Sequence, residues 1–271
     1  MRVLVATGGS HHSDVAVRFA AQLASAPADE LMIMYVRKGA ADNSQPLTQA
    51  QELARGWAPH VEIMERRGHP AEEILREAEV GDYDVVVLGE RQHHSLMTRF
   101  LLGSTAERVV EHAPVPVIIA KGEVQAAHRV LLCDSGVQTP SLLSRFSRQI
   151  PDLIGRGQTV TILHVMSQIS AGPGVRGHQL RANAEELIAA HTPEGEILER
   201  DKEVLAGYNI VPQIKVRHGR VVEEILAEAR EGAYDLIVIG SHAGEGWRRI
   251  LLDDLAHQII TQVDRPVLVV R

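Results

Sequence analysis

Two segments of the chain place a glycine-containing loop directly before a predicted helix, an arrangement that can bind phosphate. In the first segment, Gly103 and Ser104 introduce the helical pattern STAERVVEHA. Glycine lets a ligand approach the backbone, and both a serine hydroxyl and the free N–H groups of a helix N-terminus can donate to phosphate oxygens. A purely structural interpretation is also open, because Ser104 and Glu107 have the spacing of a capping box, in which both side chains cap the backbone.

The second segment, LIVIGSHAGEGWRRILLDDLA, has the same layout but begins its helix with two acids, Asp253 and Asp254. An aspartate caps a helix as well as a serine does, and its charge favours the positive end of the helix dipole. A carboxylate about 4 Å from a phosphate repels it by about 1 kcal/mol in water and by several times more in a half-buried loop. Two interpretations are open. Either the carboxylates occupy the anion position themselves and so repel triphosphate, or they only cap the helix. Both alternatives predict poor ATP binding there.

Histidine pairs follow two of the predicted strands: His11-His12 and His93-His94. Imidazoles contact phosphates when protonated and bind zinc or nickel when neutral. Consecutive histidines in a loop chelate one ion poorly, and no cysteine or carboxylate set accompanies them, so we predict no metal site. Asp134, at the end of another predicted strand, stands without a paired acid, base or metal ligand, and the chain has neither a G-x-S-x-G motif nor a Walker A sequence. We therefore predict no catalytic residues and a protein that is not an enzyme.

Composition excludes several classes of protein. Among 271 residues, Lys and Arg number 28 and Asp and Glu 35, and the net charge of −7 argues against a broad nucleic-acid interface. No apolar run approaches the ~20 residues that span a bilayer, and the N-terminus lacks the apolar segment of a signal peptide. The one cysteine excludes an internal disulfide. We expect a cytoplasmic protein without nucleic-acid or membrane partners.

The elements that must position these residues occur twice. The segment GHPAEEILREAEVGDYDVVVLG from Gly68 recurs as GRVVEEILAEAREGAYDLIVIG from Gly219, 151 residues later. The two halves also begin alike, with RVLVATGGS and RVLLCDSG, and end alike, with VPVIIAK and RPVLVVR. This repeat predicts two domains, residues 1–122 and 129–271. The second is longer mainly by SQISAGPGVRG, residues 167–177, a lid or a connector, and by a long polar helix after it.

Each half alternates strand and helix patterns. Strands such as DVVVLG and VPVIIA are apolar on both faces, as buried parallel strands are. This alternation predicts an α/β fold with two tandem doubly wound, flavodoxin-like parallel sheets. In such sheets, ligands bind at the carboxyl ends of the strands.

The two halves resemble the universal stress proteins in tandem form. The stretch that carries the resemblance best is DVVVLGERQHHSLMTRFLLGSTAERVVEHAPVPVIIAK. In ATP-binding members it corresponds to a G-x2-G-x9-G-[ST] motif followed by AERV and a proline before the last strand. The resemblance implies the strand order 3-2-1-4-5 in each half. It also implies a pseudo-twofold pairing of the halves through VPVIIA and PVLVV, and it allows a further homodimer.

The family motif is incomplete in both halves. In the first, Gly89, Gly103 and Ser104 match it, but Gln92 replaces the second glycine and the spacing is one residue longer. In the second half, Gly240 matches the first glycine, whereas Ala243, Asp253 and Asp254 replace the remaining positions.

The resemblance also assigns the nucleoside end of the site. The family places an aspartate after the first strand. This residue is Asp134 in the second half, whereas the corresponding position in the first half is Gly8. The backbone that touches adenine corresponds to Val36 and Val165.

These matches imply a stress-response protein whose adenine-nucleotide sites are partly degenerate. ATP or another adenine nucleotide is the expected ligand, and the first half is favoured because it keeps the phosphate end. The alternative is a member that binds no ATP and acts as a scaffold for unidentified protein partners. Slow ATP hydrolysis is least favoured, because a base and metal ligands are missing.

Overall fold

The computed structural model describes residues 1–37, 39, 44–90, 102–122, 126–134, 141–153, 157–166, 181–240 and 254–270. The chain forms two compact units. The first comprises residues 1–126 and 241–271, and the second comprises residues 127–240. The two domains predicted from the repeat, 1–122 and 129–271, therefore remain a prediction about folding units.

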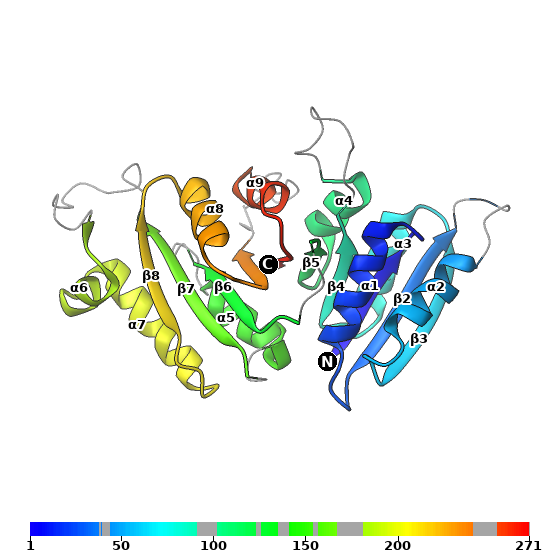
Figure 1. Ribbon diagram of the computed structural model, residues 1–271, viewed down its shortest axis with the longest axis horizontal. Helices are drawn as coiled ribbons and strands as arrows, with labels where there is room; N and C mark the ends of the chain where they lie inside the picture. The colour runs from blue at the N-terminus through cyan, green and yellow to red at the C-terminus, as the bar shows by residue number, and fades with distance from the viewer. Residues whose placement is uncertain are drawn as a thin grey trace. The chain divides into compact units, whose positions relative to one another are not determined.

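The first unit contains a parallel sheet in the order β3-β2-β1-β4-β5, as predicted, with β10 antiparallel beside β5. Helices α1 and α2 pack side by side, and so do α3 and α4, as expected when a doubly wound sheet is covered on both faces (Figure 1). Its elements are β1 (Arg2–Thr7), α1 (His11–Leu23), β2 (Glu30–Arg37), α2 (Gln45–Ala54), β3 (His60–Arg67), α3 (Pro70–Val80), β4 (Val85–Gly89), α4 (Ser104–His112), β5 (Val117–Ala120), α9 (Asp254–Gln262) and β10 (Val267–Val270).

The second unit repeats the plan with the parallel order β9-β6-β7-β8. Its elements are β6 (Arg129–Cys133), α5 (Leu142–Gln149), the 3-10 turn η1 (Pro151–Leu153), β7 (Thr159–Met166), α6 (Ala184–Ala189), α7 (Pro193–Ala206), β8 (Gln213–His218), α8 (Val221–Glu231) and β9 (Leu236–Gly240). The single long polar helix predicted here is wrong, because α6 and α7 are separate helices. Thr192 starts α7 as a new helix: its hydroxyl accepts from the Gly195 N–H at 3.0 Å, and Pro193 follows it.

The central strands are buried on both faces. In β1, Val3, Leu4 and Val5 have no exposed surface, and β4 is equally buried over Val85 to Val87. Continuous apolar runs thus mark strands covered by helices on both sides. None of the helices in the described part of the chain is long and apolar enough to cross a membrane.

Strand β10 pairs with β5, which is the pairing predicted for VPVIIA and PVLVV, and both strands belong to the first unit. In the antiparallel pair of β5 and β10, Leu268 lies opposite Ile118. Beside this pair, the buried Lys121 contacts Glu90 at 2.9 Å and donates to the Ile260 carbonyl near the end of α9. A cation at a helix C-terminus is favourable, so Lys121 fixes α9 to the ends of β4 and β5. Burial lowers the pKa of Lys121, and Glu90 opposes that shift.

A buried glutamate ties a helix to the edge strand in each unit. In the first unit, Glu77 of α3 accepts from Arg66 of β3 and from the Tyr83 hydroxyl, each at 2.9 Å. In the second, Glu228 of α8 accepts from Arg217 at 2.7 Å and from the Tyr234 hydroxyl at 2.6 Å. These residues match at the same 151-residue separation as the sequence repeat.

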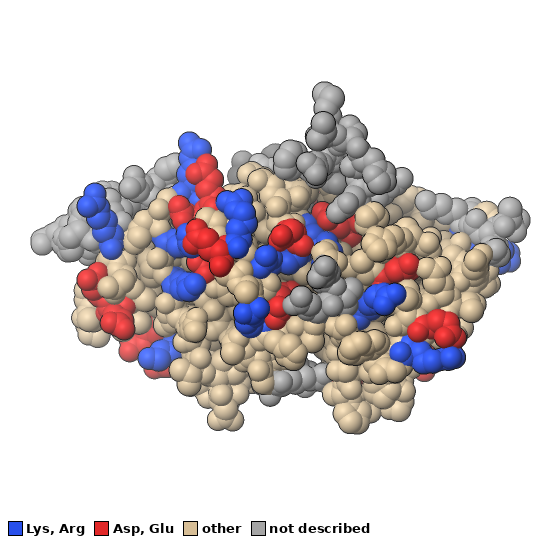
Figure 2. Space-filling view, viewed as in Figure 1, with Lys and Arg blue, Asp and Glu red and all other residues tan. Residues whose placement is uncertain are grey.

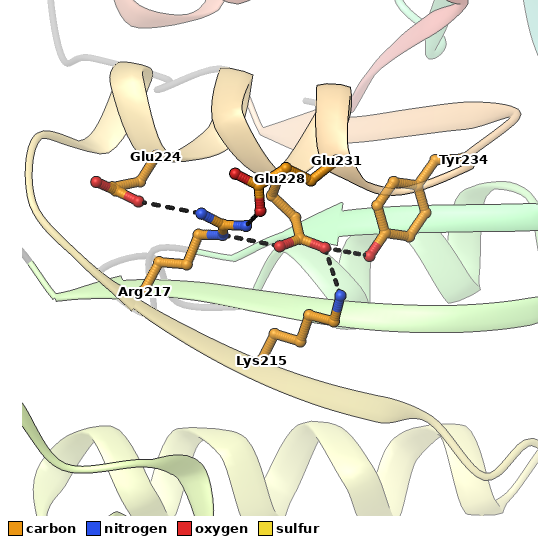
Figure 3. A network of polar contacts seen from close by, with 6 residues as sticks. All are labelled: Lys215, Arg217, Glu224, Glu228, Glu231 and Tyr234. Carbon is orange, nitrogen blue, oxygen red and sulfur yellow. Dashed lines mark hydrogen bonds and ion pairs between the residues drawn. The ribbon is translucent and has the colours of Figure 1, made fainter.

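Glu228 has one further partner, the ammonium group of Lys215 at 2.7 Å (Figure 3). Arg217 also pairs with Glu224 and Glu231, so one guanidinium group serves three acids of α8. Burial alone would raise the pKa of Glu228, but hydrogen bonds from Lys215, Tyr234 and Arg217 outweigh burial and lower it. The carboxylate is therefore charged and satisfied although it is only 2% exposed.

Surface charges are mixed rather than segregated. On the face drawn in Figure 2, the described acidic and basic side chains form mixed groups. Pairs one helical turn apart, such as Arg55 with Glu52 and Arg220 with Glu223, belong to exposed helix faces. Each such exposed pair contributes little to stability.

We expect Glu228→Gln to lower the free energy of unfolding by about 1–3 kcal/mol, because charge-assisted hydrogen bonds to a buried group are lost. Urea unfolding of the full chain measures this change. The loss should shrink as the pH falls below about 4.5, since the lowered pKa makes the contribution of Glu228 present at higher pH and lost in acid. Glu223→Gln, on the exposed face of the same helix, is the control and should stay within about 0.5 kcal/mol. Equal effects of the two variants would contradict the role given to Glu228.

Candidate functional site

The predicted nucleoside and phosphate residues of the first half lie at one edge of its sheet. Thr7 ends β1 and pairs with Tyr35 of β2, which places Val36 one step further along the same edge. Gly89 ends the neighbouring parallel strand β4. Because carboxyl ends of parallel strands share an edge, Val36 and Gly89 are brought to the face where ligands bind in this architecture.

Glycine is required at one of these positions by a close backbone contact. A Cβ atom added to Gly89 would lie 2.2 Å from the His12 carbonyl oxygen, in the first turn of α1. A Cβ atom at Gly8 would meet nothing within 4 Å. The end of β4 is therefore packed directly against the start of α1, whereas the turn after β1 is open to solvent.

The capping box predicted at Ser104 is wrong. Helix α4 has Gly103 as its N-cap, and no side chain caps it there. Ser104 is exposed and already belongs to the first helical turn, one residue too late to cap. The Glu107 N–H donates to the Gly103 carbonyl at 2.9 Å instead. In α1, by contrast, Ser10 and Ser13 form a complete capping box.

The predicted nucleoside acid of the second half, Asp134, is buried and only 4% exposed. It directly follows β6, whose first residue Arg129 matches Arg2 of β1, so strand register places Thr7 in the equivalent position of the first half. The prediction of Gly8 at that position is wrong by one residue. Neither half keeps an acid that is open to solvent at the end of its first strand.

A second acid, Asp201 of α7, meets Asp134. Asp201 has no exposed surface, and a hydrogen bond joins its carboxyl group to that of Asp134. The Ser141 hydroxyl donates to Asp201 Oδ1 at 3.4 Å, and the guanidinium group of Arg200 lies at the same distance. Burial first, and then the charge of Asp134, raise the pKa of Asp201 to about 7. We call Asp134 and Asp201 the carboxyl pair.

Two further groups surround the carboxyl pair. The Nδ1 atom of His164 in β7 lies 3.3 Å from the Asp134 carbonyl oxygen, and because a carbonyl only accepts, the ring donates. Burial lowers the pKa of His164, which favours the neutral ring. Arg145 of α5 is half-buried and is attracted to Asp134. Asp134 is thus held by the protein's own groups.

The remaining predicted residues fall at strand ends or outside the described residues. Val165 is partly buried in β7 opposite Arg217, and Gly240 ends β9. Helix α9 begins at Asp254, the predicted start of the second late helix. The described part of the chain contains no group of three His, Cys, Asp or Glu side chains that could hold a metal ion. Predictions that lie outside the described residues concern Gln92, His93, His94, Ala243, Asp253 and residues 167–177.

Sequence reasoning missed Asp201. The available signal was its spacing, because Leu198, Asp201 and Leu205 fall on one face of a helix and all three are buried. An acid within an apolar stripe needs a buried partner. The sequence does not say which residue that partner is.

A family model described as the universal stress protein family matches residues 1–121 and 149–271. Over 306 aligned residues, the chain is 27% identical to a universal stress protein from Mycolicibacterium smegmatis, which covers 99% of this chain and 96% of that protein.

Solved structures agree on the fold. A universal stress protein from Archaeoglobus fulgidus superposes with a TM-score of 0.71 at 19% identity, covering 100% of this chain and 98% of that one. A functionally unknown protein from Pseudomonas aeruginosa superposes with a TM-score of 0.69 at 18% identity, covering 99% and 92%. At these identities, the two structures show a shared fold.

We expect Ser104→Ala to leave stability within about 0.5 kcal/mol of wild type, because the hydroxyl of Ser104 does not cap α4. Ser10→Ala removes a true N-cap and should cost about 1 kcal/mol. Urea unfolding of both variants checks the difference. A larger loss for Ser104→Ala than for Ser10→Ala would restore the capping interpretation.

Gly89→Ala should destabilise the chain by about 1–3 kcal/mol, because its Cβ atom cannot be accommodated against the backbone of His12. Gly8→Ala, where the added atom meets open space, is the matched control and should be nearly neutral. Thermal unfolding of the two variants tests this contrast. If both alanines are tolerated equally, β4 and α1 are not packed as described.

Proposed function

Because the chain belongs to the universal stress protein family, we propose that it is a cytoplasmic stress-response protein that binds an adenine nucleotide in its first half. The bound nucleotide acts as a signal and is not turned over, since the described residues around the site include no group of side chains that could hold a metal ion. The second half binds no nucleotide of its own. Pairing of β5 with β10 joins the end of the chain to the nucleotide-binding half.

The observation that carries this proposal is the uncapped start of α4. No side chain among the described residues caps the helix at Gly103, so the first backbone N–H groups and the exposed Ser104 hydroxyl can donate to an anion. The helix follows β4 in a doubly wound sheet, so its N-terminus belongs to the same edge as Val36 and Gly89. Phosphate oxygens at α4 and the nucleoside near Val36 fit this edge.

The carboxyl pair supports the assignment to the first half. Asp134 is the acid that the family motif would offer to a nucleoside, but Asp201 and Arg145 already engage it. A ligand hydroxyl would have to displace these contacts and would gain no free carboxylate. The second half therefore keeps the acid in sequence while using it internally.

The first experiment is to denature freshly purified protein and to identify any released small molecule by mass spectrometry, followed by calorimetric titration with ATP, ADP and AMP. About one equivalent of adenine nucleotide per chain supports the proposal. An empty protein that also fails to bind in titration would overturn it. The second candidate, a scaffold for protein partners, would then take its place.

Gly103→Asp should weaken ATP binding at least tenfold, because the new carboxylate repels phosphate and copies the acids of the second half. Ser104→Ala should weaken it about tenfold through loss of one hydrogen bond to a charged group, without loss of stability. Calorimetric titration measures both changes. Asp134→Asn is the control and should leave the affinity within about twofold. A nucleotide that binds Gly103→Asp normally but is lost in Asp134→Asn would move the site to the second half.

A further inference from the structure

The carboxyl pair takes no part in the proposed nucleotide site, yet both of its acids are buried. Asp201 is fully buried, and Asp134 is nearly so. They come from different elements, because Asp134 follows β6 and Asp201 lies on the inner face of α7. Any force between the two carboxyl groups therefore acts directly between α7 and the end of β6.

Two ionised carboxylates cannot donate to each other, so their hydrogen bond requires a proton on one of them. Asp201 Oδ2 is buried, and no donor among the described residues reaches it. A proton between the two groups satisfies this oxygen. Two adjacent acids that share one proton are the standard result of close like charges in a dry site.

The surroundings decide which acid carries the proton. Arg145 is attracted to Asp134, whereas Asp201 is the acid whose pKa is raised. Arg200 lies beside Asp201, but its guanidinium group is exposed to solvent and screened. The Ser141 hydroxyl donates to the other oxygen of Asp201, Oδ1. Asp134 is therefore the acceptor and Asp201 the donor.

We propose that Asp201 and Asp134 share one proton, that this proton holds α7 against the end of β6, and that its loss to solvent as the pH rises to neutrality loosens α7. The inference rests on the geometry of the second unit alone and does not depend on nucleotide binding. Loss of the proton leaves two charges in contact, and their repulsion is relieved only when α7 moves away.

The first unit lacks this device at the same place. Leu47, Ala50 and Ala54 of α2 match the buried stripe of α7 at the 151-residue separation of the repeat, and all three are buried. Asp201 corresponds to Ala50, and Asp134 corresponds to Thr7. The two halves therefore differ by a pair of acids in one contact, which makes α2 an internal reference for α7.

Other charged groups around α7 do not replace the carboxyl pair. The neighbouring α6 presents Glu185 and Glu186, which are both exposed, and Glu186 caps its own helix. Histidines near the pair are His164 of β7 and His218 of β8, which repel each other's charged forms. The titratable and charged groups that surround Asp201 are Asp134 after β6, Arg145 from α5, His164 from β7, His218 from β8, Glu185 and Glu186 from α6, and Glu194 and Arg200 on α7 itself.

The direction of the pH effect follows from linkage. Asp201 holds its proton more tightly when α7 is docked than when the side chain is exposed, where its pKa is 3.8. The stabilisation is complete below that value and is lost as the pH rises towards about 7. With one proton involved, the equilibrium for opening α7 increases by up to about tenfold per pH unit within this range.

Hydrogen–deuterium exchange of the full chain, followed by mass spectrometry between pH 5 and pH 7 and corrected for intrinsic rates, tests the proposal. We expect the protection of α7 amides to fall by several-fold to tenfold per pH unit, while α2 and α8 change much less. Asp201→Asn should abolish the pH dependence, because the amide donates to Asp134 at every pH. Glu203→Gln, on the exposed face of α7, should behave as wild type.

Carbon-13 NMR of the aspartate carboxyl carbons gives a second readout that needs no variant except for assignment. The Asp201 signal should titrate well above the ordinary aspartate range. A signal that titrates near pH 4 would overturn the proposal. Equal loss of protection in α7 and α8 would also overturn it, because the proton would then act on the whole unit rather than on α7.

Discussion

A carboxyl group can be buried only if the protein replaces the hydrogen bonds that water would give it, and this requirement organises both units. Glu77 and Glu228 meet it with an arginine and a tyrosine hydroxyl, and they tie a helix to an edge strand. Asp201 meets it with another acid. Hydrogen bonds from Lys215, Tyr234 and Arg217 keep Glu228 charged, whereas the contact with Asp134 keeps Asp201 protonated. The buried acid is therefore a fixed charge at Glu228 and a group that holds a proton at Asp201.

The two halves share the buried glutamate with its arginine and tyrosine, but only the second half has the carboxyl pair. Arg66, Glu77 and Tyr83 recur as Arg217, Glu228 and Tyr234, and Lys215 adds a cation where the first unit has Met64. The halves differ at the end of the first strand and in the helix that packs near it. Thr7 and Ala50 of the first half correspond to Asp134 and Asp201 of the second. Among the described residues, no side chain caps α4 in the first half, whereas in the second half Asp134 at the end of β6 contacts the buried Asp201. A duplicated fold can retain its framework while the sites at its edge separate.

The sequence allowed most of the fold to be predicted, because apolar runs and the repeat depend on short-range patterns. Strand order in the first unit and the pairing of the last strands came from the family resemblance and were confirmed. The wrong predictions concern features that depend on the exact position of one residue, such as the start of a helix. A capping box needs Ser104 at the N-cap, but the helix begins there, and pattern alone does not fix a helix start to one residue. The contact of Asp134 with Asp201 joins positions far apart in the chain, which no local pattern reports.

The pairing of β5 with β10 has a consequence for biosynthesis. The chain is made from its N-terminus, so β10, which follows all the strands of the second unit in the sequence, leaves the ribosome after them. Until then, the first unit has all five parallel strands but an unpaired edge at β5, and Lys121 lacks the carbonyl of Ile260. An open edge strand is a template for pairing with other chains. The first unit therefore begins to be synthesised first but receives its strand β10 only after the second unit has been made. The edge of β5 must stay free of other partners during that time.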